Sequence, residues 1–235
     1  MSITVQNTSA MYNNNLKIVD ILPVDYLKNQ KCLILAGGPS LKKVSQEIIY
    51  GWRSVGVNRS YEKFNTDILY CMDLEFYDRI WQLQFGQETF DKFQAFPGAK
   101  VFLSMPADIK YKYGVCVVNR IYEETLSYNI NNGIFAGGNS GLGAVMLAIA
   151  LGCKDIYIAG LDLKATDQTH YHTGYIGQEI DKFRSVLFQF QSEFEHWAPR
   201  FKEEGIKITQ LIAKSVDETS LTCFDKEFIN SRYII

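Results

Sequence analysis

The sequence predicts an α/β protein with a mostly parallel β-sheet and helices on both faces. Two observations support this class. Continuous apolar runs such as residues 31–37 and 155–163 lack polar alternation, which is typical of strands buried on both faces. Segments in which apolar residues recur at helical spacing separate these runs, and strands that alternate with helices form parallel sheets.

The predicted elements follow one another in order from residue 31. The expected strands are residues 31–37, 53–58, 67–73, 101–105, 115–119, 155–163 and 207–213. The expected helices are residues 41–49, 75–85, 142–152, a long helix from residue 176 that Pro199 ends or kinks, and a short helix within 225–234. The apolar stripe of the long helix is interpreted as core, and it also suits the seam of a homo-oligomer.

The 235 residues suit one domain of ordinary size. Residues 1–30 are polar and weakly patterned, so we expect an N-terminal arm there and a single domain over residues 31–235. The N-terminal sequence lacks the pattern of a signal peptide, and the longest apolar stretch, residues 142–153, is too short to cross a bilayer. Five widely spaced cysteines, an odd number, are typical of free thiols in a reducing compartment. We therefore expect a cytoplasmic protein without a transmembrane segment.

The charge balance argues against nucleic-acid binding. Twenty-four Lys and Arg residues accompany 26 Asp and Glu residues, which gives a net charge of −2, and no block of like charge occurs. A protein that binds a phosphate backbone needs a concentration of positive charge. We therefore expect no nucleic-acid partner.

Ligands of open parallel sheets bind at the carboxyl ends of the strands, so the loops there contain the candidate site residues. Gly37, Gly38, Pro39 and Ser40 follow the first strand and precede a predicted helix. Glycines allow close backbone approach and a helix N-terminus offers amide groups to an anion, so this turn is a candidate phosphate cradle. A structural turn with Pro39 at the first helical position is the alternative.

A second glycine-rich segment precedes the helix at residues 142–152. Asn139, Ser140 and Gly141 lie at its start. Asn139 or Ser140 taken alone is best interpreted as an N-cap. Two glycine-rich helix starts in one sheet favour a nucleotide bound between them.

Acidic residues follow two of the strands. Asp73 and Glu75 have a spacing that suits a divalent cation on a diphosphate, or a helix-capping Asp followed by a first-turn Glu. Asp162 suits either an acid that orients a substrate hydroxyl or a loop cap.

Two of the three histidines, His170 and His172, lie in the polar loop after the strand at 155–163. Imidazole suits proton transfer near neutral pH, so these residues are candidates for a general base or a phosphate contact. The alternative is a surface loop in which these histidines have no function. His172 is preferred as the base because Thr173 and Gly174 beside it suit a flexible turn. Zinc is disfavoured because no cysteine lies at ligand spacing.

Four segments resemble a known group of proteins. They are CLILAGGPSLKKV (residues 32–44), VGVNRS (55–60), GNSGLGAVMLAIALGCKDIYIAGLDL (138–163) and HYHTGY (170–175). The chain is similar there to bacterial sialyltransferases that use CMP-sialic acid. It is also similar to the related Rossmann-like domain of flagellar motility accessory factors and archaeal hydroxymethylpterin diphosphokinases. The resemblance covers roughly residues 31–215 and implies a Rossmann-like nucleotide-binding catalytic domain, which we expect over residues 31–235.

The sialyltransferase pattern implies specific roles. It places residues 37–40 at the nucleotide phosphate and ribose, Asn58 at the nucleotide, and Ser140 and Gly141 at the cytidine or the phosphate. It also implies that His170 or His172 is the general base. The chain departs from the pattern where Gly37 replaces an asparagine and where no arginine precedes Ser140. The His-x-His spacing is closer to that of the accessory factors and diphosphokinases.

The resulting hypothesis is a glycosyltransferase that moves a sugar from a nucleotide-activated donor, of the CMP type, to a hydroxyl acceptor by direct displacement. A histidine deprotonates the acceptor, and no cofactor is required. The alternative is a diphosphokinase that needs magnesium on Asp73 and Glu75. A nucleotide-binding module without catalytic activity is a third interpretation.

Overall fold

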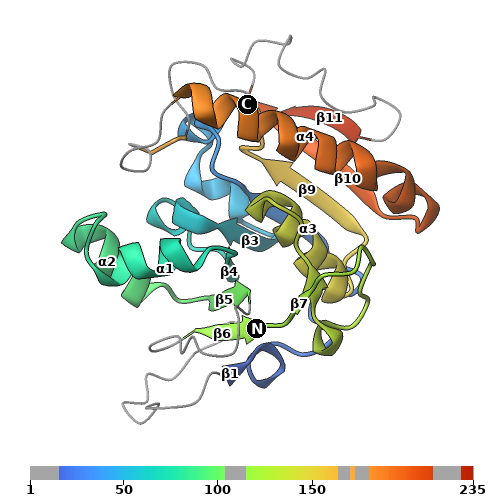
Figure 1. The fold of residues 1–235 in the computed structure, drawn as a ribbon, viewed down its shortest axis with the longest axis horizontal. Helices are drawn as coiled ribbons and strands as arrows, with labels where there is room; N and C mark the ends of the chain where they lie inside the picture. The colour runs from blue at the N-terminus through green and yellow to red at the C-terminus, as the bar shows by residue number, and fades with distance from the viewer. Residues whose placement is uncertain (1–15, 104–114, 164–169, 173–179, 214–228, 235) are drawn as a thin grey trace.

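The computed structural model describes residues 16–103, 115–163, 170–172, 180–213 and 229–234. Nine strands in these residues form one sheet in the order β1-β6-β5-β4-β3-β2-β9-β10-β11, and every neighbouring pair is parallel (Figure 1). This confirms the predicted α/β class. The strands are β1 Leu16–Lys17, β2 Lys31–Leu35, β3 Arg53–Val57, β4 Ile68–Cys71, β5 Ala99–Leu103, β6 Cys116–Val118, β9 Asp155–Ala159, β10 Lys207–Ala213 and β11 Ile229–Ile234.

Four α-helices and several short 3-10 helices surround this sheet. The α-helices are α1 Leu74–Trp81, α2 Gln87–Ala95, α3 Ser140–Ala150 and α4 Ile180–Glu203. The 3-10 helices are η1 Ile18–Asp20, η2 Pro39–Lys43, η3 Gln46–Ile49, η4 Asn58–Glu62 and η5 Ile130–Asn132. A separate pair of short parallel strands, β7 Arg120–Ile121 and β8 Ile134–Phe135, lies outside the main sheet.

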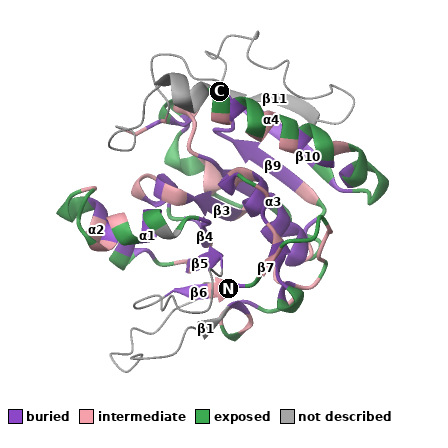
Figure 2. Ribbon diagram, viewed as in Figure 1, coloured by how far each residue is buried: buried purple, intermediate pink, exposed green. Residues whose placement is uncertain are grey.

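Alternate residues of β2, β4, β5 and β9 belong to different hydrophobic clusters, so both faces of the sheet are covered. On β2, Cys32 and Ile34 pack in the cluster that includes α3 and part of α4, whereas Leu33 and Leu35 pack against η2. The helices α1 and α2 cover one face of the sheet at β4 and β5. The strands β2 to β6 and β9 are accordingly mostly buried, and exposed residues concentrate on the outer sides of the helices (Figure 2).

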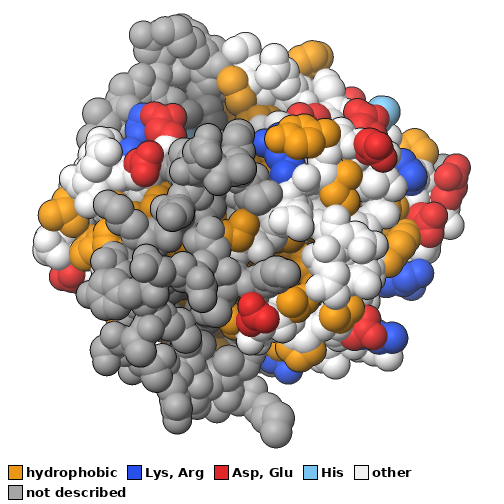
Figure 3. All heavy atoms as spheres, turned by 60° about the horizontal axis from the view of Figure 1, so that its bottom comes forward, with side chains coloured by type: hydrophobic (Ala, Val, Ile, Leu, Met, Phe, Trp, Pro, Cys, Tyr) orange, Lys and Arg blue, Asp and Glu red, His pale blue; other side chains and the backbone are white. Residues whose placement is uncertain are grey.

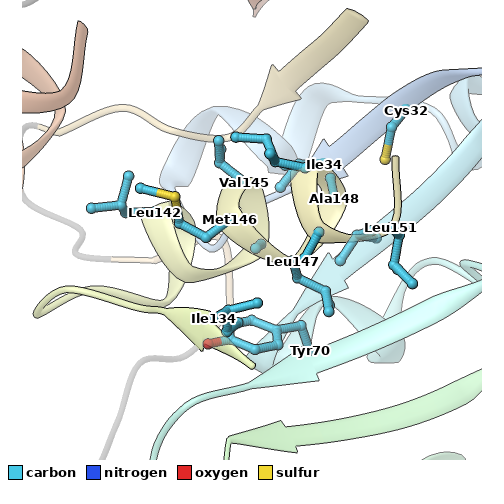
Figure 4. Packing of buried hydrophobic residues seen from close by; sticks show 14 of the residues in the cluster. Cys32, Ile34, Tyr70, Ile134, Leu142, Val145, Met146, Leu147, Ala148 and Leu151 are labelled. Atoms are coloured by element: carbon cyan, nitrogen blue, oxygen red, sulfur yellow. The ribbon is translucent and has the colours of Figure 1, made fainter. Parts of the chain in front are cut away.

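Helix α3 is the most deeply buried helix described. Ten of its eleven residues are buried, and it is apolar on all sides, as expected for a helix enclosed by protein. Leu142, Val145 and Met146 pack on the strands together with Ile134 and Tyr70 (Figure 4). Small residues let the helix approach the sheet closely.

Two predicted elements, and one of the two effects expected of Pro199, differ from the structure. Residues 41–49 form two 3-10 segments instead of one helix, because Val44 is extended (ψ 125°) and the Ser45 side chain caps a new turn at the Glu47 amide. Pro199 does not end α4, which continues to Glu203. The predicted short helix within 225–234 is wrong for residues 229–234, since β11 pairs there in parallel with β10. Pairing with an open strand edge outweighs local helix propensity.

The described part of the predicted N-terminal arm is integrated into the domain. The strand β1 pairs with β6, and Ile18, Leu22 and Leu27 are buried in the main cluster. Residue 30 is therefore not a structural boundary. Residues 1–15 lie outside the described part.

The cysteines and the charged residues of the described part agree with what the composition predicts. Four of the cysteines, Cys32, Cys71, Cys116 and Cys153, are buried and unpaired, and Cys223 lies outside the described residues. Acidic and basic side chains of the described residues are interspersed on the face drawn in Figure 3. No helix in the described ranges has the length and apolar character needed to span a bilayer.

The close approach of α3 to β4 yields a stability prediction. A Cβ atom at Gly143 would contact the Tyr70 hydroxyl and lie 2.9 Å from Tyr70 Cε1. Gly to Ala normally stabilises a helix, but overpacking a core costs about 1–3 kcal/mol. We expect Gly143→Ala to lower the free energy of unfolding by about that amount, measured by urea denaturation. Tyr70→Phe in the same background should recover part of the loss, and a Gly143→Ala protein as stable as the parent would contradict the packing.

Candidate functional site

The strand order reverses direction between β2 and β9, which makes the crevice at their carboxyl ends the expected ligand position of this fold. Three segments meet there. Residues 37–40 follow β2, residues 160–162 follow β9, and residues 170–172 lie across them. The backbone amide of Tyr171 donates a hydrogen bond to Gly37 O at 3.1 Å. The structure therefore brings together the predicted glycine turn, Asp162 and both predicted histidines.

The glycine turn is bonded to the loop after β9. The Gly38 amide donates to Gly160 O at 2.7 Å, and the Ser40 amide donates to Asp162 Oδ2 at 2.7 Å. The Ser40 hydroxyl donates to the other oxygen of Asp162, and Pro39 has no amide hydrogen. Two amides of the predicted phosphate cradle, those of Gly38 and Ser40, are therefore already bonded within the protein. In this conformation, the structural turn is the interpretation that the hydrogen bonds support.

Asp162 is held by Ser40 and half-buried. Burial raises the pKa of its carboxyl above the usual range, while the two hydrogen bonds from Ser40 oppose that rise. The carboxylate satisfies the first turn of η2, as a loop cap would. A direct bond from this carboxylate to a substrate hydroxyl would compete with Ser40.

Asn58 combines two unusual properties at the end of β3. Its φ of +50° lies in the left-handed region, which Asn tolerates better than most residues. Its side-chain Oδ1 is buried and has no hydrogen-bond partner among the described residues. Strained backbone and unsatisfied buried acceptors are both concentrated at binding sites. Asn58 thus remains a candidate ligand contact, as the resemblance implied.

Arg59, the next residue, connects η4 to the histidine segment. Its guanidinium forms a two-point ion pair with Glu62, in which Arg59 Nη2 lies 3.0 Å from Glu62 Oε2. Arg59 Nη1 lies 3.3 Å from His172 Nδ1. The Tyr171 hydroxyl donates to the backbone oxygen of Arg59. These contacts attach residues 170–172 to the carboxyl ends of β2 and β3.

The two histidines are stacked and half-buried. Their ring centroids are 4.9 Å apart, with an angle of 16° between the ring planes. Burial and then the charge of Arg59 lower the pKa of His170 to about 4. The same causes, with smaller contributions from His170 and Lys42, lower the pKa of His172 to about 2. Both imidazoles are therefore neutral at pH 7 in the free protein, and the expected titration near neutral pH is shifted to lower pH.

Asp73 and Glu75 lie at the end of β4 and the start of α1. Desolvation and the neighbouring Glu75 raise the pKa of Asp73, and Arg120 opposes this rise. Glu75 is largely exposed and forms an ion pair with Arg79 one helical turn later. Among the described residues, no three His, Cys, Asp or Glu side chains gather as metal ligands. The pair can supply at most two carboxylates to a cation.

A side chain of α4, Glu193, forms hydrogen bonds with the second glycine-rich segment. Asn139 Oδ1 accepts a hydrogen bond from the Leu142 amide at 2.7 Å, which confirms its predicted interpretation as the N-cap of α3. Glu193 accepts hydrogen bonds from the Gly138 amide (2.8 Å) and from the Asn139 side-chain nitrogen (2.7 Å). A carboxylate of the protein therefore already lies at this helix start. Gly141 is close to Leu161, which places the start of α3 beside the loop after β9.

Four further residues of this region were not predicted from the sequence: Arg59, Glu62, Arg120 and Glu193. Arg120 donates to Gly137 O at 3.1 Å and brings a guanidinium to the glycine-rich segment from β7. Arg59 directly follows Asn58, so its position was a usable signal. Nothing in the local sequence marks Glu193, one polar position on a long helix. Thr173 and Gly174, on which the preference for His172 depended, lie outside the described residues.

A pocket of about 370 Å³ lies near the amino ends of β3 and β4, away from this edge. Three polar residues of its lining, Ser54, Lys63 and Asp67, form hydrogen bonds within the protein. Asp67 accepts from the Ser54 amide and hydroxyl, and Lys63 donates to the carbonyl groups of Leu41 and Lys42. The candidate site is therefore placed at the carboxyl edge.

Adjacent glycines provide a matched test of the turn. A Cβ at Gly38 would lie 2.5 Å from Gly160 O and even closer to Asp162, whereas a Cβ at Gly37 would lie 3.3 Å from His170 Cδ2. We expect Gly38→Ala to lower the free energy of unfolding by about 1–3 kcal/mol, because it separates Asp162 from Ser40. Gly37→Ala should cost clearly less. Equal stabilities in urea denaturation would show that the turn is not closed on Asp162.

The lowered histidine pKa values predict an acid-sensitive fold. Unfolded imidazoles bind protons near pH 6.5, whereas folded His170 does so only near pH 4, so stability falls as the pH decreases through this interval. We expect the double variant with His170→Gln and His172→Gln to lose less stability than the parent between pH 7 and 4.5, by about 2 kcal/mol for each histidine replaced. Urea denaturation at both pH values measures this. His196→Gln is the control, and identical pH dependence in all three proteins would refute the assignment.

Comparisons with known proteins add little to this geometry. No family model matches the sequence, and no curated protein matches it. One similar solved structure is the crystal structure of an oxidoreductase (short chain dehydrogenase/reductase) from Brucella ovis. It is 14% identical, with 88% of this chain and 100% of that chain covered, at a TM-score of 0.29. A similarity of this size carries no functional argument.

Proposed function

We propose that this protein is a glycosyltransferase that transfers a sugar from a nucleotide-activated donor, of the CMP type, to a hydroxyl acceptor. The main support is the placement of residues 170–172. This segment holds two neutral imidazoles over the ends of β2 and β3, in contact with Arg59, the residue after Asn58. The four segments that resemble sialyltransferases include these loops, which is why the donor is proposed to be CMP-activated.

In the proposed reaction the acceptor oxygen attacks the anomeric carbon while the bond from that carbon to the donor phosphate breaks. The acceptor proton must go to a base that is unprotonated at neutral pH. His170 is the better candidate. His172 Nδ1 lies against an N–H of Arg59, which can only donate, so the remaining nitrogen of neutral His172 carries the proton. The proposed base is therefore His170, whereas the sequence favoured His172.

A base with a pKa near 4 is weak in the free protein, but the donor would change its environment. The donor phosphate adds negative charge, and a nearby negative charge favours the imidazolium form. The pKa of His170 should therefore rise when the donor binds. Asn58 and the start of α3 are the proposed contacts of the nucleotide, and Asp162 acts by fixing the glycine turn through Ser40.

One observation keeps the magnesium-dependent diphosphokinase as a second candidate. The carboxyls of Asp73 and Glu75 are near enough to raise the pKa of Asp73, and magnesium is commonly held by one or two carboxylates together with substrate phosphates. Glu75 would have to leave Arg79 to take part. The transferase proposal requires neither carboxylate as a ligand.

A thermal-shift panel separates these candidates. It contains CMP, CDP, UDP, GDP, AMP and ATP, each with and without magnesium. We expect CMP to stabilise the protein without magnesium, since a ligand at a hundred times its Kd contributes about 2.7 kcal/mol. Stabilisation only by ATP with magnesium, abolished in Asp73→Asn, would favour the diphosphokinase. No shift with any nucleotide would reject both.

Where transfer or donor hydrolysis is observed, His170→Ala should lower kcat by about 10²- to 10⁴-fold while the midpoint shift with CMP stays unchanged. His196→Ala is the matched control, because His196 lies on α4 and pairs with Glu124. A His170→Ala enzyme with parental kcat would remove the general base from the proposal.

A further inference from the structure

We infer that Glu62 and Arg59 are positioning residues that hold His172 as a neutral imidazole with its proton on Nε2, so that His172 is a hydrogen-bond donor. The tautomer follows from this chain's own contacts. The role of that donor, toward an anionic oxygen of the substrate, rests on the proposed function.

The first step is the orientation of Arg59. Its Nε and Nη2 groups face the two carboxylate oxygens of Glu62, which is a two-point contact that fixes the plane of the guanidinium. Arg59 and Glu62 are both largely buried, with side-chain exposures of 7% and 16%. The guanidinium also stacks on Phe85, with Cζ 4.7 Å from the ring centroid. Because Nε and Nη2 are bonded to Glu62, Nη1 points away from that carboxylate.

The second step is the contact of Nη1 with His172. Nη1 lies 3.3 Å from His172 Nδ1. Arg has no acceptor and keeps its proton at any pH compatible with the fold, so Nδ1 must be the acceptor. A neutral imidazole that accepts at Nδ1 is protonated at Nε2. A proton on Nδ1 would instead face a guanidinium N–H.

The described groups around the ring of His172 keep it neutral. Arg59, Lys42 and the stacked His170 all lower the pKa of His172, and burial lowers it most. Glu62 is the nearby counter-charge, but its oxygens are occupied by Arg59. The ring thus stays neutral across the physiological pH range, and a neutral donor adds no charge of its own near a substrate phosphate. His170 and His172 have different tasks in this arrangement, as acceptor and donor.

The tautomer is directly measurable. Long-range ¹H–¹⁵N NMR spectra of the full chain distinguish protonated from unprotonated ring nitrogens, and His172→Gln identifies the signals. We expect the parent to show Nε2–H at His172 with no titration between pH 8 and 5. A Nδ1–H tautomer, or a titration at the ordinary value of about 6.5, would overturn the inference.

Three variants separate geometry from charge. Arg59→Met should allow neutral His172 to adopt both tautomers and should raise the pKa of His172. Arg59→Lys keeps the charge but loses the two-point contact with Glu62, so it should keep the pKa low and lose the single tautomer. Lys42→Met is the matched control, which removes a more distant charge and should leave the tautomer unchanged. An unchanged tautomer in both Arg59 variants would overturn the assignment of Arg59. If Arg59→Met does not fold, Arg59→Lys decides.

Activity tests the donor role separately. The side-chain amide of Gln can donate but cannot take up a proton at neutral pH. With an active donor, His172→Gln should keep most of the parental kcat and His172→Ala should lose at least tenfold, whereas His170→Gln should be as impaired as His170→Ala. Equal loss in His172→Gln and His172→Ala would refute the donor role. Absence of turnover in the parent with every nucleotide sugar would refute the proposed function, and the NMR spectra would still decide the tautomer.

Discussion

The position of β2 between β3 and β9 determines where the polar residues of this protein lie. All three strands are parallel and buried, so their side chains contribute to the core and their polar functions are displaced to the loops at their ends. The chain proceeds from β2 toward β3 on one side and reaches β9 only much later, so the loops after β2 and β9 meet at the point where the strand order reverses. The starts of η2 and α3 both lie next to the loop after β9. Residues 122 positions apart, Ser40 and Asp162, are therefore hydrogen-bonded neighbours.

The carboxyl edge is organised by three carboxylates that bind groups of the protein itself. Asp162 binds Ser40, Glu193 binds the Gly138 amide and Asn139, and Glu62 binds Arg59. Each occupies donors that an anionic ligand would otherwise use. Buried donors and charges require such partners, since leaving them unsatisfied is costly. A phosphate ligand must therefore either contact donors outside these three pairs or displace a carboxylate. Asn58 Oδ1, which has no partner in the described residues, is an acceptor and therefore suits a hydroxyl or amino group of a ligand and not its phosphate.

Periodicity and turn chemistry predicted most of the sheet, because strands buried on both faces require continuous apolar runs such as residues 31–35. They failed where a contact distant in sequence decides the local structure. The strand β11 depends on the edge of β10, and the first described residues depend on β6. The same limit applies to the site. Strand ends nominated Asn58, Asp162 and the histidines, but whether an amide is available or already bonded depends on a partner such as Asp162 that no local pattern reveals.

The electrostatics of the histidine segment connect this internal pairing to substrate charge. Burial and Arg59 keep both imidazoles neutral while no anion is present. A phosphate placed beside them would offset the positive charge of Arg59 and favour proton uptake. The effect should be largest at His170, because His172 already accepts a hydrogen bond from the guanidinium. His172 is constrained by Arg59 and His170 is not constrained by that contact. The same arginine therefore gives two stacked, chemically identical side chains different protonation behaviour, which is what transfer of a proton in one direction requires.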